Sequence, residues 1–255
     1  MITLKEQYKA IIKEYVRQFC EITNLDFEYW TGPVDGHLSM FRHASRYGVV
    51  SDMAPSWWAR SSYCATLMGY VSTNEQYIID HTDDWFVVKL SPSEMLQKCK
   101  QDPLLFNLFR LTFCITTQIS TSRELNRVSP NAIAERSTRY CSAKDGLEIC
   151  KPWWFNPKEK PGNSYIFYKS WKNAEETYKA ALETGMKTED ARGVLPLDTA
   201  TKVIYTYSVK EWQHIIDLRY YGTTGIPHPN AKLVIGMVRE QINQFAKENN
   251  IDFQV

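Results

Sequence analysis

The segment TSRELNRVSPNAIAERSTRY, residues 121–140, carries the strongest signal in this sequence. It contains no lysine, and its four arginines are Arg123, Arg127, Arg136 and Arg139. A planar guanidinium fork binds two phosphate oxygens at once, whereas a lysine offers only a point charge. The hydroxyl groups of Ser137 and Thr138, with the backbone amides beside them, are suited to complete a phosphate cradle. The segment predicts a nucleotide phosphate site, and a solvated helical face is the alternative.

Two further segments predict strands. Over residues 108–117, apolar and polar residues alternate in the manner of a half-buried strand, with Leu111, Phe113 and Ile115 on one face and Arg110, Thr112 and Thr116 on the other. A second strand is predicted from Lys202 to Tyr207. Ser208, followed by Glu211 three residues later, predicts a capping box that begins a helix ending near Gly222.

The arginine-rich segment contains its own helix signals. Thr121 and Glu124 have the spacing of a capping box, so a helix is predicted to begin there. It should end near Val128, because the residue before Pro130 avoids helical angles. Ser129 before that proline predicts the start of a second, short helix.

Apolar spacing predicts three more helices, over residues 4–20, over residues 171–186 and in a final segment after Pro229. Asp145-Gly146 predicts a tight turn between short strands. The sequence has no internal repeat. The pattern predicts one mixed α+β domain over residues 1–255.

Bulk composition excludes several classes. The 255 residues have a formal net charge of +1, so no global field favours nucleic acid or an anionic membrane. No apolar run resembles a signal peptide or a membrane span. The six cysteines include no Cys-x-x-Cys pair, which predicts a reduced cytoplasmic protein without a metal site. A bridge between Cys141 and Cys150 is the alternative.

Three separated segments together resemble the flavin-dependent thymidylate synthase family, especially its bacteriophage and gut-bacterial forms. Residues 120–127 followed by 135–140 are similar to its Arg-His-Arg, spacer, Glu-x-Ser-x-Arg-Tyr signature. Gly185 with residues 191–197 resembles its second phosphate and sugar segment, and residues 211–230 resemble its closing helix and loop. His37-x-Ser39-x-x-Arg42-His43 is a weaker match to a flavin-contacting motif, and a family-type insertion would account for residues at about 44–107.

The resemblance implies a central, mainly antiparallel sheet flanked by helices. It also implies methylation of dUMP to dTMP with bound FAD, and methylenetetrahydrofolate and NADPH as co-substrates. The family forms homotetramers whose active sites lie between subunits, and it needs no cysteine nucleophile.

Family roles are carried over one residue at a time. Arg219 would sit against the uracil and favour ionisation at its ring nitrogen, as the catalytic residue. The dUMP-binding set would be Arg123, Glu124, Glu135, Ser137, Thr138, Arg139 and Arg192. The FAD-binding set would be His37, Ser39, Arg127, Lys210, His214 and His228.

Structural alternatives stay open for several of these residues. Arg139 and Arg192 also fit surface ion pairs, with Glu135 as a partner four residues from Arg139. Arg219 also fits a cation at a helix end. His228 also fits a loop or cap residue.

The sequence departs from the family mainly on the flavin side. Arg127-Val128-Ser129 stands where the family has Arg-His-Arg, and Arg42 stands where it has a glutamate. Ala132 replaces a serine, and Lys210 ends the segment where the family has Asn-x-Arg. Two further functions therefore stay open. One is a regulatory or non-catalytic nucleotide-binding relative without flavin, and the other is a transferase that makes a different C5 modification of a pyrimidine.

Overall fold

The computed structural model describes residues 27–29, 43, 45–51, 64–74, 77–78, 86–128, 132–139, 146–156, 162–252 and 255. The chain folds as two compact units, each built from separate stretches. Of the described residues, the first unit comprises those within 116–124 and 135–202, and the second comprises those within 27–115, 125–134 and 203–255. The helix predicted over residues 4–20 lies outside the described residues.

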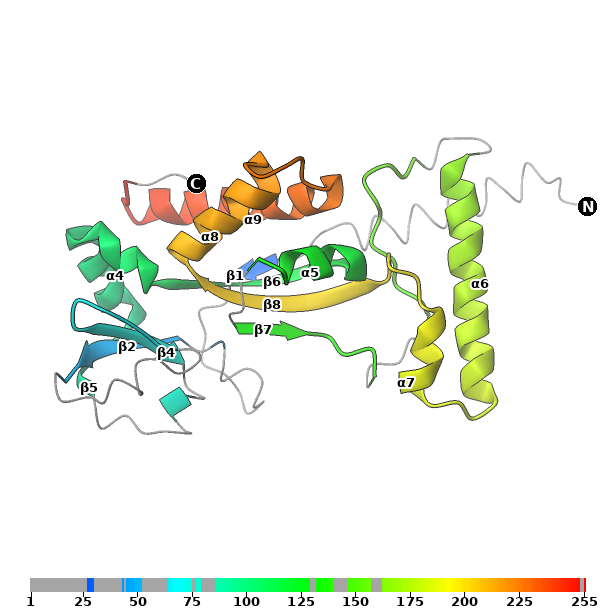
Figure 1. Ribbon diagram of the computed structural model, residues 1–255, viewed down its shortest axis with the longest axis horizontal. Coiled ribbons are helices and arrows are strands. Elements are labelled where there is room, and N and C mark those ends of the chain that lie inside the picture. Colours follow the sequence, from blue (N-terminus) through cyan, green and yellow to red (C-terminus); the bar gives the residue numbers. More distant parts are fainter. Residues whose placement is uncertain are drawn as a thin grey trace, which may run out of the picture. The chain divides into compact units, whose positions relative to one another are not determined.

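One four-stranded sheet has the strand order β1-β6-β8-β7 (Figure 1). Its strands are β1 (Phe27–Tyr29), β6 (Arg110–Gln118), β8 (Ala200–Ser208) and β7 (Ala132–Glu135). β1 and β6 pair antiparallel, with Phe27 opposite Ile115. The strands predicted over residues 108–117 and 202–207 are confirmed as β6 and β8. Both run from one unit into the other, and the single domain over residues 1–255 stays a prediction.

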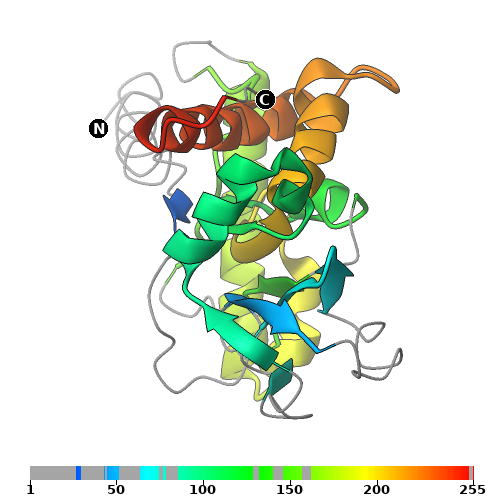
Figure 2. The ribbon, with the colours of Figure 1, turned by 90° about the vertical axis from the view of Figure 1, so that its left-hand side faces the viewer.

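The predicted insertion at about 44–107 contributes a second sheet, with the order β3-β4-β2-β5. Its strands are β3 (Ala65–Leu67), β4 (Tyr70–Asn74), β2 (Ser45–Val50) and β5 (Phe86–Leu90), and every pair is antiparallel. Met68 and Gly69 join β3 to β4 with φ of 54° and 79°, as a tight two-residue hairpin requires. Helix α4 (Pro92–Gln101) packs on β2 and β5 (Figure 2), and the 3-10 helix η2 (Pro103–Asn107) follows it. The α+β class is confirmed.

Helix α8 (Val209–Ile216) is fixed at its start and along its buried face. Ser208 Oγ accepts the Glu211 N–H at 3.2 Å, and Glu211 Oε2 accepts the Ser208 N–H at 2.8 Å, so the predicted capping box is confirmed. Trp212 is buried, and its Nε1 donates to the Leu111 carbonyl at 3.0 Å. Its ring packs edge-on against Phe113 and Tyr207, at centroid distances of 5.1 and 5.0 Å. These contacts fix α8 on the sheet within the second unit.

The chain after α8 continues as one π-helical turn, η4 (Asp217–Tyr221), and ends at Gly222, where φ is 74°. A Cβ at Gly222 would lie 2.8 Å from the Gly225 carbonyl oxygen. The position therefore favours glycine both for its positive φ and for this close approach of the backbone. Helix α9 (Pro229–Glu248) follows and confirms the predicted final helix. It packs against both α8 and η4.

Strand β6 is more deeply covered than a half-buried strand. Leu111, Phe113 and Ile115 are buried as predicted, but Thr112 on the other face is buried too. The Thr112 and Thr206 hydroxyl oxygens are 2.8 Å apart, and the His43 Nδ1 lies 2.8 Å from the same Thr206 oxygen. These hydrogen bonds satisfy the buried hydroxyl of Thr112, which the alternating pattern predicted to face solvent.

Two local predictions near the arginine-rich segment are wrong. Helix α5 (Ile119–Leu125) begins before Thr121, which is buried inside it and donates to Gln118 Oε1 at 2.9 Å instead of capping. The short helix predicted from Pro130 gives way to strand β7, which begins at Ala132. Pairing beside β8 outweighs the local signal there, and the Arg136 N–H extends that pairing to the Lys202 carbonyl at 2.8 Å.

The first unit contains α6 (Asn163–Glu183), α7 (Thr188–Ala191) and the 3-10 helix η3 (Arg192–Val194). α6 confirms the helix predicted over residues 171–186, although it begins at Asn163 and ends at Glu183. Trp171 and Tyr178 lie on its buried face. Helices α7 and η3 pack against α6. Cys150 is a free, buried thiol, and Cys141 and Asp145 lie outside the described residues.

The capping box of α8 gives a direct stability test. Replacing Ser208 by alanine removes the acceptor for the Glu211 N–H, so the free energy of unfolding should fall by about 1 kcal/mol. Urea denaturation of the purified protein measures this. The matched control is Ser170→Ala on the exposed face of α6, which should change the value by less than about 0.5 kcal/mol. Equal effects of the two substitutions would contradict the capping role.

Candidate functional site

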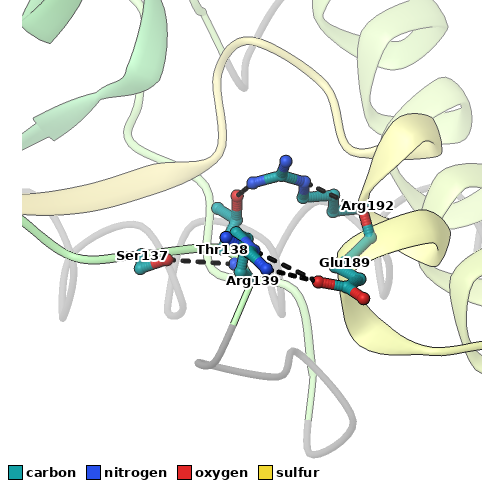
Figure 3. A network of polar contacts seen from close by, with 5 residues as sticks. All are labelled: Ser137, Thr138, Arg139, Glu189 and Arg192. Atoms are coloured by element: carbon teal, nitrogen blue, oxygen red, sulfur yellow. Dashed lines mark hydrogen bonds and ion pairs between the residues drawn. The ribbon is translucent and has the colours of Figure 1, made fainter.

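Two arginines from distant parts of the first unit converge on one short helix (Figure 3). Arg139, which follows β7, directs its Nη2 and Nε to Glu189 Oε2 on α7, at 2.8 and 3.2 Å. Arg192, the first residue of η3, donates from Nε to the Glu189 carbonyl at 3.0 Å and from Nη1 to Thr138 Oγ1 at 3.3 Å. We call Ser137, Thr138, Arg139, Glu189 and Arg192 the arginine cluster.

Local backbone geometry holds the arginine cluster in place. The Ser137 hydroxyl accepts the Arg139 N–H at 3.2 Å, which is a turn typical of serine. Ala191, the last residue of α7, is buried and holds that helix against the unit. The side chains of Arg139 and Glu189 are 50% and 38% exposed. The cluster is therefore anchored at its base by a hydrogen-bonded turn and a buried residue, and its side chains are open to solvent.

The other predicted dUMP-binding residues lie on neighbouring elements of the same unit. Glu135 at the end of β7 accepts a hydrogen bond from the Ser122 hydroxyl at 2.6 Å. Arg139 pairs with Glu189, and the alternative of an ion pair between Glu135 and Arg139 stays a prediction. Arg123 is exposed on α5 and Glu124 is partly exposed beside it.

Sequence reasoning missed two residues around this site, Glu189 and Ser122. Glu189 provides both acceptors that bring Arg139 and Arg192 together, and Ser122 holds Glu135. The sequence offers no local signal for this role of Glu189, because its carboxylate binds Arg139, which lies 50 residues earlier in the chain.

The second unit contains a cavity of about 550 Å³, which we call the α8 cavity. Its volume falls within the range of small-ligand pockets, about 300–1,000 Å³. Two predicted FAD-binding residues, Lys210 and His214, line it from α8. The remaining lining residues are Cys64, Ala65, Asn107, Arg110, Val128, Ser208, Glu211 and Ile215.

Arg110 also lines the α8 cavity, and sequence reasoning did not predict it as a site residue. Its side chain is only partly exposed, and this burial lowers the pKa of the guanidinium. The Glu211 carboxylate lies near enough to favour its charged form. Its backbone N–H donates to the Tyr47 hydroxyl at 2.9 Å, which ties β6 to the second sheet. Burial also raises the pKa of the Cys64 thiol to about 11.

The remaining predicted residues occupy separate positions. Arg219 lies within the π-helical turn η4, a type of irregularity that is frequent at functional sites. His228 caps α9, because its Nδ1 accepts the Asn230 N–H at 3.3 Å. This contact agrees with the alternative that His228 is a cap residue. Arg127 is exposed in the turn after α5. His37 and Ser39 lie outside the described residues.

Two kinds of feature are absent from the described residues. No helix in this part of the chain is long and apolar enough to cross a membrane. Across the same residues, histidine, cysteine and acidic side chains form no group of three that could hold a metal ion.

Comparisons with known proteins agree with this picture. Residues 96–243 match the family described as thymidylate synthase complementing protein. A flavin-dependent thymidylate synthase of Synechocystis sp. is 24% identical over 157 residues, which cover 53% of this chain and 69% of that relative. One from Geobacter sulfurreducens is 30% identical over 101 residues, covering 39% of this chain and 43% of the relative.

Two further similarities are more limited. A probable flavin-dependent thymidylate synthase of Paramecium bursaria Chlorella virus 1 is 33% identical over 76 residues, covering 30% of this chain and 31% of the relative. The chain thus matches less than half the length of the Geobacter and viral proteins. A crystal structure of a UMP/dUMP methylase PolB from Streptomyces cacaoi, bound with 5-Br dUMP, is 22% identical with a TM-score of 0.46, covering 67% of this chain and 81% of that chain. Because the family match spans more than half of the chain, the protein belongs to the thymidylate synthase complementing protein family, that of the flavin-dependent thymidylate synthases.

Proposed function

We propose that the protein is a methyltransferase-type enzyme that methylates C5 of the uracil of dUMP to give dTMP. Family membership and relatives named flavin-dependent thymidylate synthases support this proposal. The cofactor in the proposal is FAD, with methylenetetrahydrofolate as carbon donor and NADPH as reductant. The active form in the proposal is a cytoplasmic homotetramer with active sites between subunits.

The observation that carries the proposal is the convergence of Arg139 and Arg192. The two guanidinium groups come from segments about fifty residues apart and are bridged by a single residue, Glu189. The Ser137 and Thr138 hydroxyls lie in the same cluster. Two guanidinium groups and two hydroxyl groups offer a phosphate monoester more hydrogen-bond donors than lysine ammonium groups would.

The Arg139–Glu189 ion pair is compatible with phosphate binding. Both side chains are more than a third exposed, and ion pairs of that kind contribute about 0–1 kcal/mol. A phosphate group carries up to two negative charges and three acceptor oxygens. In the proposal, the phosphate of dUMP therefore replaces the Glu189 carboxylate on Arg139. The other members of the predicted dUMP set, Arg123, Glu124 and Glu135, lie on neighbouring elements of this unit.

The proposed catalytic residue is Arg219. Methylation at C5 requires electron density at that carbon, and a fixed cation beside the uracil stabilises the negative charge that develops on its ring nitrogen. The π-helical turn holds Arg219 in a backbone geometry set by Gly222.

The α8 cavity is suited to the anionic part of a flavin nucleotide. Among the described lining residues, Arg110 and Lys210 provide two cations and Glu211 one carboxylate, and His214 adds a ring nitrogen. In the proposal, Lys210 and His214 hold FAD, together with His37, Ser39, Arg127 and His228. FAD, when bound, supplies the hydride chemistry of the reaction.

Two of the described thiols, Cys99 and Cys150, fit a mechanism without a cysteine nucleophile. Burial raises the pKa of Cys99 and of Cys150 to about 12. Because the thiolate is the nucleophilic form, neither thiol is poised to attack a pyrimidine at neutral pH.

A second candidate function is favoured by one observation, Val128 on the wall of the α8 cavity. The family pattern has a histidine at this position, and valine offers no donor to a cofactor. A regulatory relative that binds the nucleotide without flavin would have this feature.

The absorption spectrum and the reaction product of freshly purified protein distinguish the enzyme from the regulatory candidate. The enzyme is expected to be yellow, or to become yellow on reconstitution with FAD, with the two visible absorption bands of an oxidised flavin. With dUMP and methylenetetrahydrofolate it should oxidise NADPH, and mass spectrometry should find dTMP. Protein that binds dUMP but stays colourless after reconstitution would support the regulatory candidate instead. A product other than dTMP would identify a different C5 transferase.

The arginine cluster gives a second test. Arg139→Met and Arg192→Met should each weaken dUMP binding about tenfold to a hundredfold, because each removes a charge-assisted pair with phosphate. Calorimetry with dUMP, and with deoxyuridine as the ligand without phosphate, measures the effect. Deoxyuridine binding should hardly change.

The matched control for these variants is Arg136→Met. Arg136 belongs to the same arginine-rich segment but pairs with Glu148 at 3.1 Å on the surface. If this control weakens dUMP binding as much as the cluster variants do, a specific phosphate clamp is ruled out.

Arg219 gives a third test. Arg219→Ala should reduce turnover by at least about a hundredfold, because a preorganised cation at a developing charge typically contributes that much. Thermal unfolding and calorimetry of dUMP should show a folded protein that still binds the phosphate. Turnover close to that of the unchanged protein would remove Arg219 from the catalytic role.

A further inference from the structure

The α8 cavity has an excess of positively charged side chains, and they belong to separate segments of the chain. Arg110 comes from β6 and Lys210 from α8, while among the described lining residues the one carboxylate is that of Glu211. Glu211 is already engaged, because its Oε2 accepts the Ser208 N–H in the capping box. The positive N-terminal end of α8 lies at the same wall, through Ser208. The cavity therefore favours an anion.

Arg110 is placed to meet that anion with a fork of donors. It is the first residue of β6, and its N–H is fixed on the Tyr47 hydroxyl of the second sheet at 2.9 Å. Cys64 and Ala65, from the segment predicted as an insertion, line the same cavity. The insertion thus builds part of the wall beside Arg110. Burial lowers the pKa of this guanidinium, and an anionic ligand would oppose that effect.

Val128 lines the cavity within the stretch where the family pattern reads Arg-His-Arg, so two donor side chains of that pattern are absent from this chain. We infer that Arg110 replaces them, by binding the phosphate oxygens of the flavin nucleotide in the α8 cavity. This inference rests on the proposed function, since it names a further residue for the same cofactor. It makes Arg110 the residue that selects phosphorylated flavins over riboflavin.

The test compares three flavins on the chain of 255 residues. Dissociation constants for FAD, FMN and riboflavin are measured by quenching of flavin fluorescence. Arg110→Met keeps much of the side-chain volume but removes the charge. It should weaken FAD and FMN about tenfold to a hundredfold and leave riboflavin unchanged, because only the first two carry phosphate. Arg46→Met is the matched control, since Arg46 lies on β2 and does not line the cavity.

A rescue variant sharpens the test. Val128→Arg, added to Arg110→Met, places a guanidinium on another wall of the same cavity and should restore at least part of the lost FAD affinity. Arg110→Lys keeps the charge without the fork, so it should lose several-fold in FAD affinity. It serves as the reporter if Arg110→Met does not fold, as judged by circular dichroism.

The outcomes separate the inference from the proposed function. Suppose that the unsubstituted protein binds FAD and that Arg110→Met and Arg110→Lys bind it with the same affinity. The role of Arg110 is then overturned, while the proposed function stands. Equal losses for FAD, FMN and riboflavin also overturn it, because they would mean a structural effect. If the unchanged protein binds none of the three flavins, the FAD part of the proposed function fails and the inference fails with it. Calorimetry of dUMP then shows whether nucleotide binding survives.

Discussion

The packing of Trp212 against the sheet is the contact on which the second unit depends. Its indole donates to the Leu111 carbonyl at 3.0 Å, and its ring packs edge-on against Phe113 and Tyr207. One buried side chain thus joins α8 to both β6 and β8. Because Trp212 faces the sheet, the residues two positions to either side of it, Lys210 and His214, emerge at the cavity wall. The position of the cationic side chains follows from an aromatic anchor.

Sequence reasoning succeeded where the deciding interaction is local. The capping box of Ser208 and Glu211 spans four residues, so its spacing alone predicted where α8 begins. The same spacing at Thr121 and Glu124 failed, because Thr121 is buried and its hydroxyl binds Gln118. The Ser-Pro signal before Ala132 failed for a related reason, since β7 joins the sheet beside β8. In both cases a tertiary contact outweighed the local signal.

The candidate sites show the same limit. Arg139 and Arg192 were found because each belongs to a recognisable motif. Glu189, which brings them together, was not found, because its role appears only when α7 lies beside the segment after β7. Arg110 was read as one polar residue of an alternating strand. Its place on a cavity wall depends on the insertion and on α8, which no pattern within β6 encodes.

The two cationic regions differ in how much their charge costs the folded protein. Arg139 is half exposed and already paired, so hydration and Glu189 both stabilise its charge without a ligand. Arg110 is less exposed, and desolvation opposes its charge even with Glu211 nearby. Replacing a whole buried ion pair by apolar residues is often neutral or stabilising, so a buried charge is weak evidence for a role in stability. The proposed anion therefore explains a guanidinium at Arg110 better than stability does, and this reason is weaker for the half-exposed Arg139.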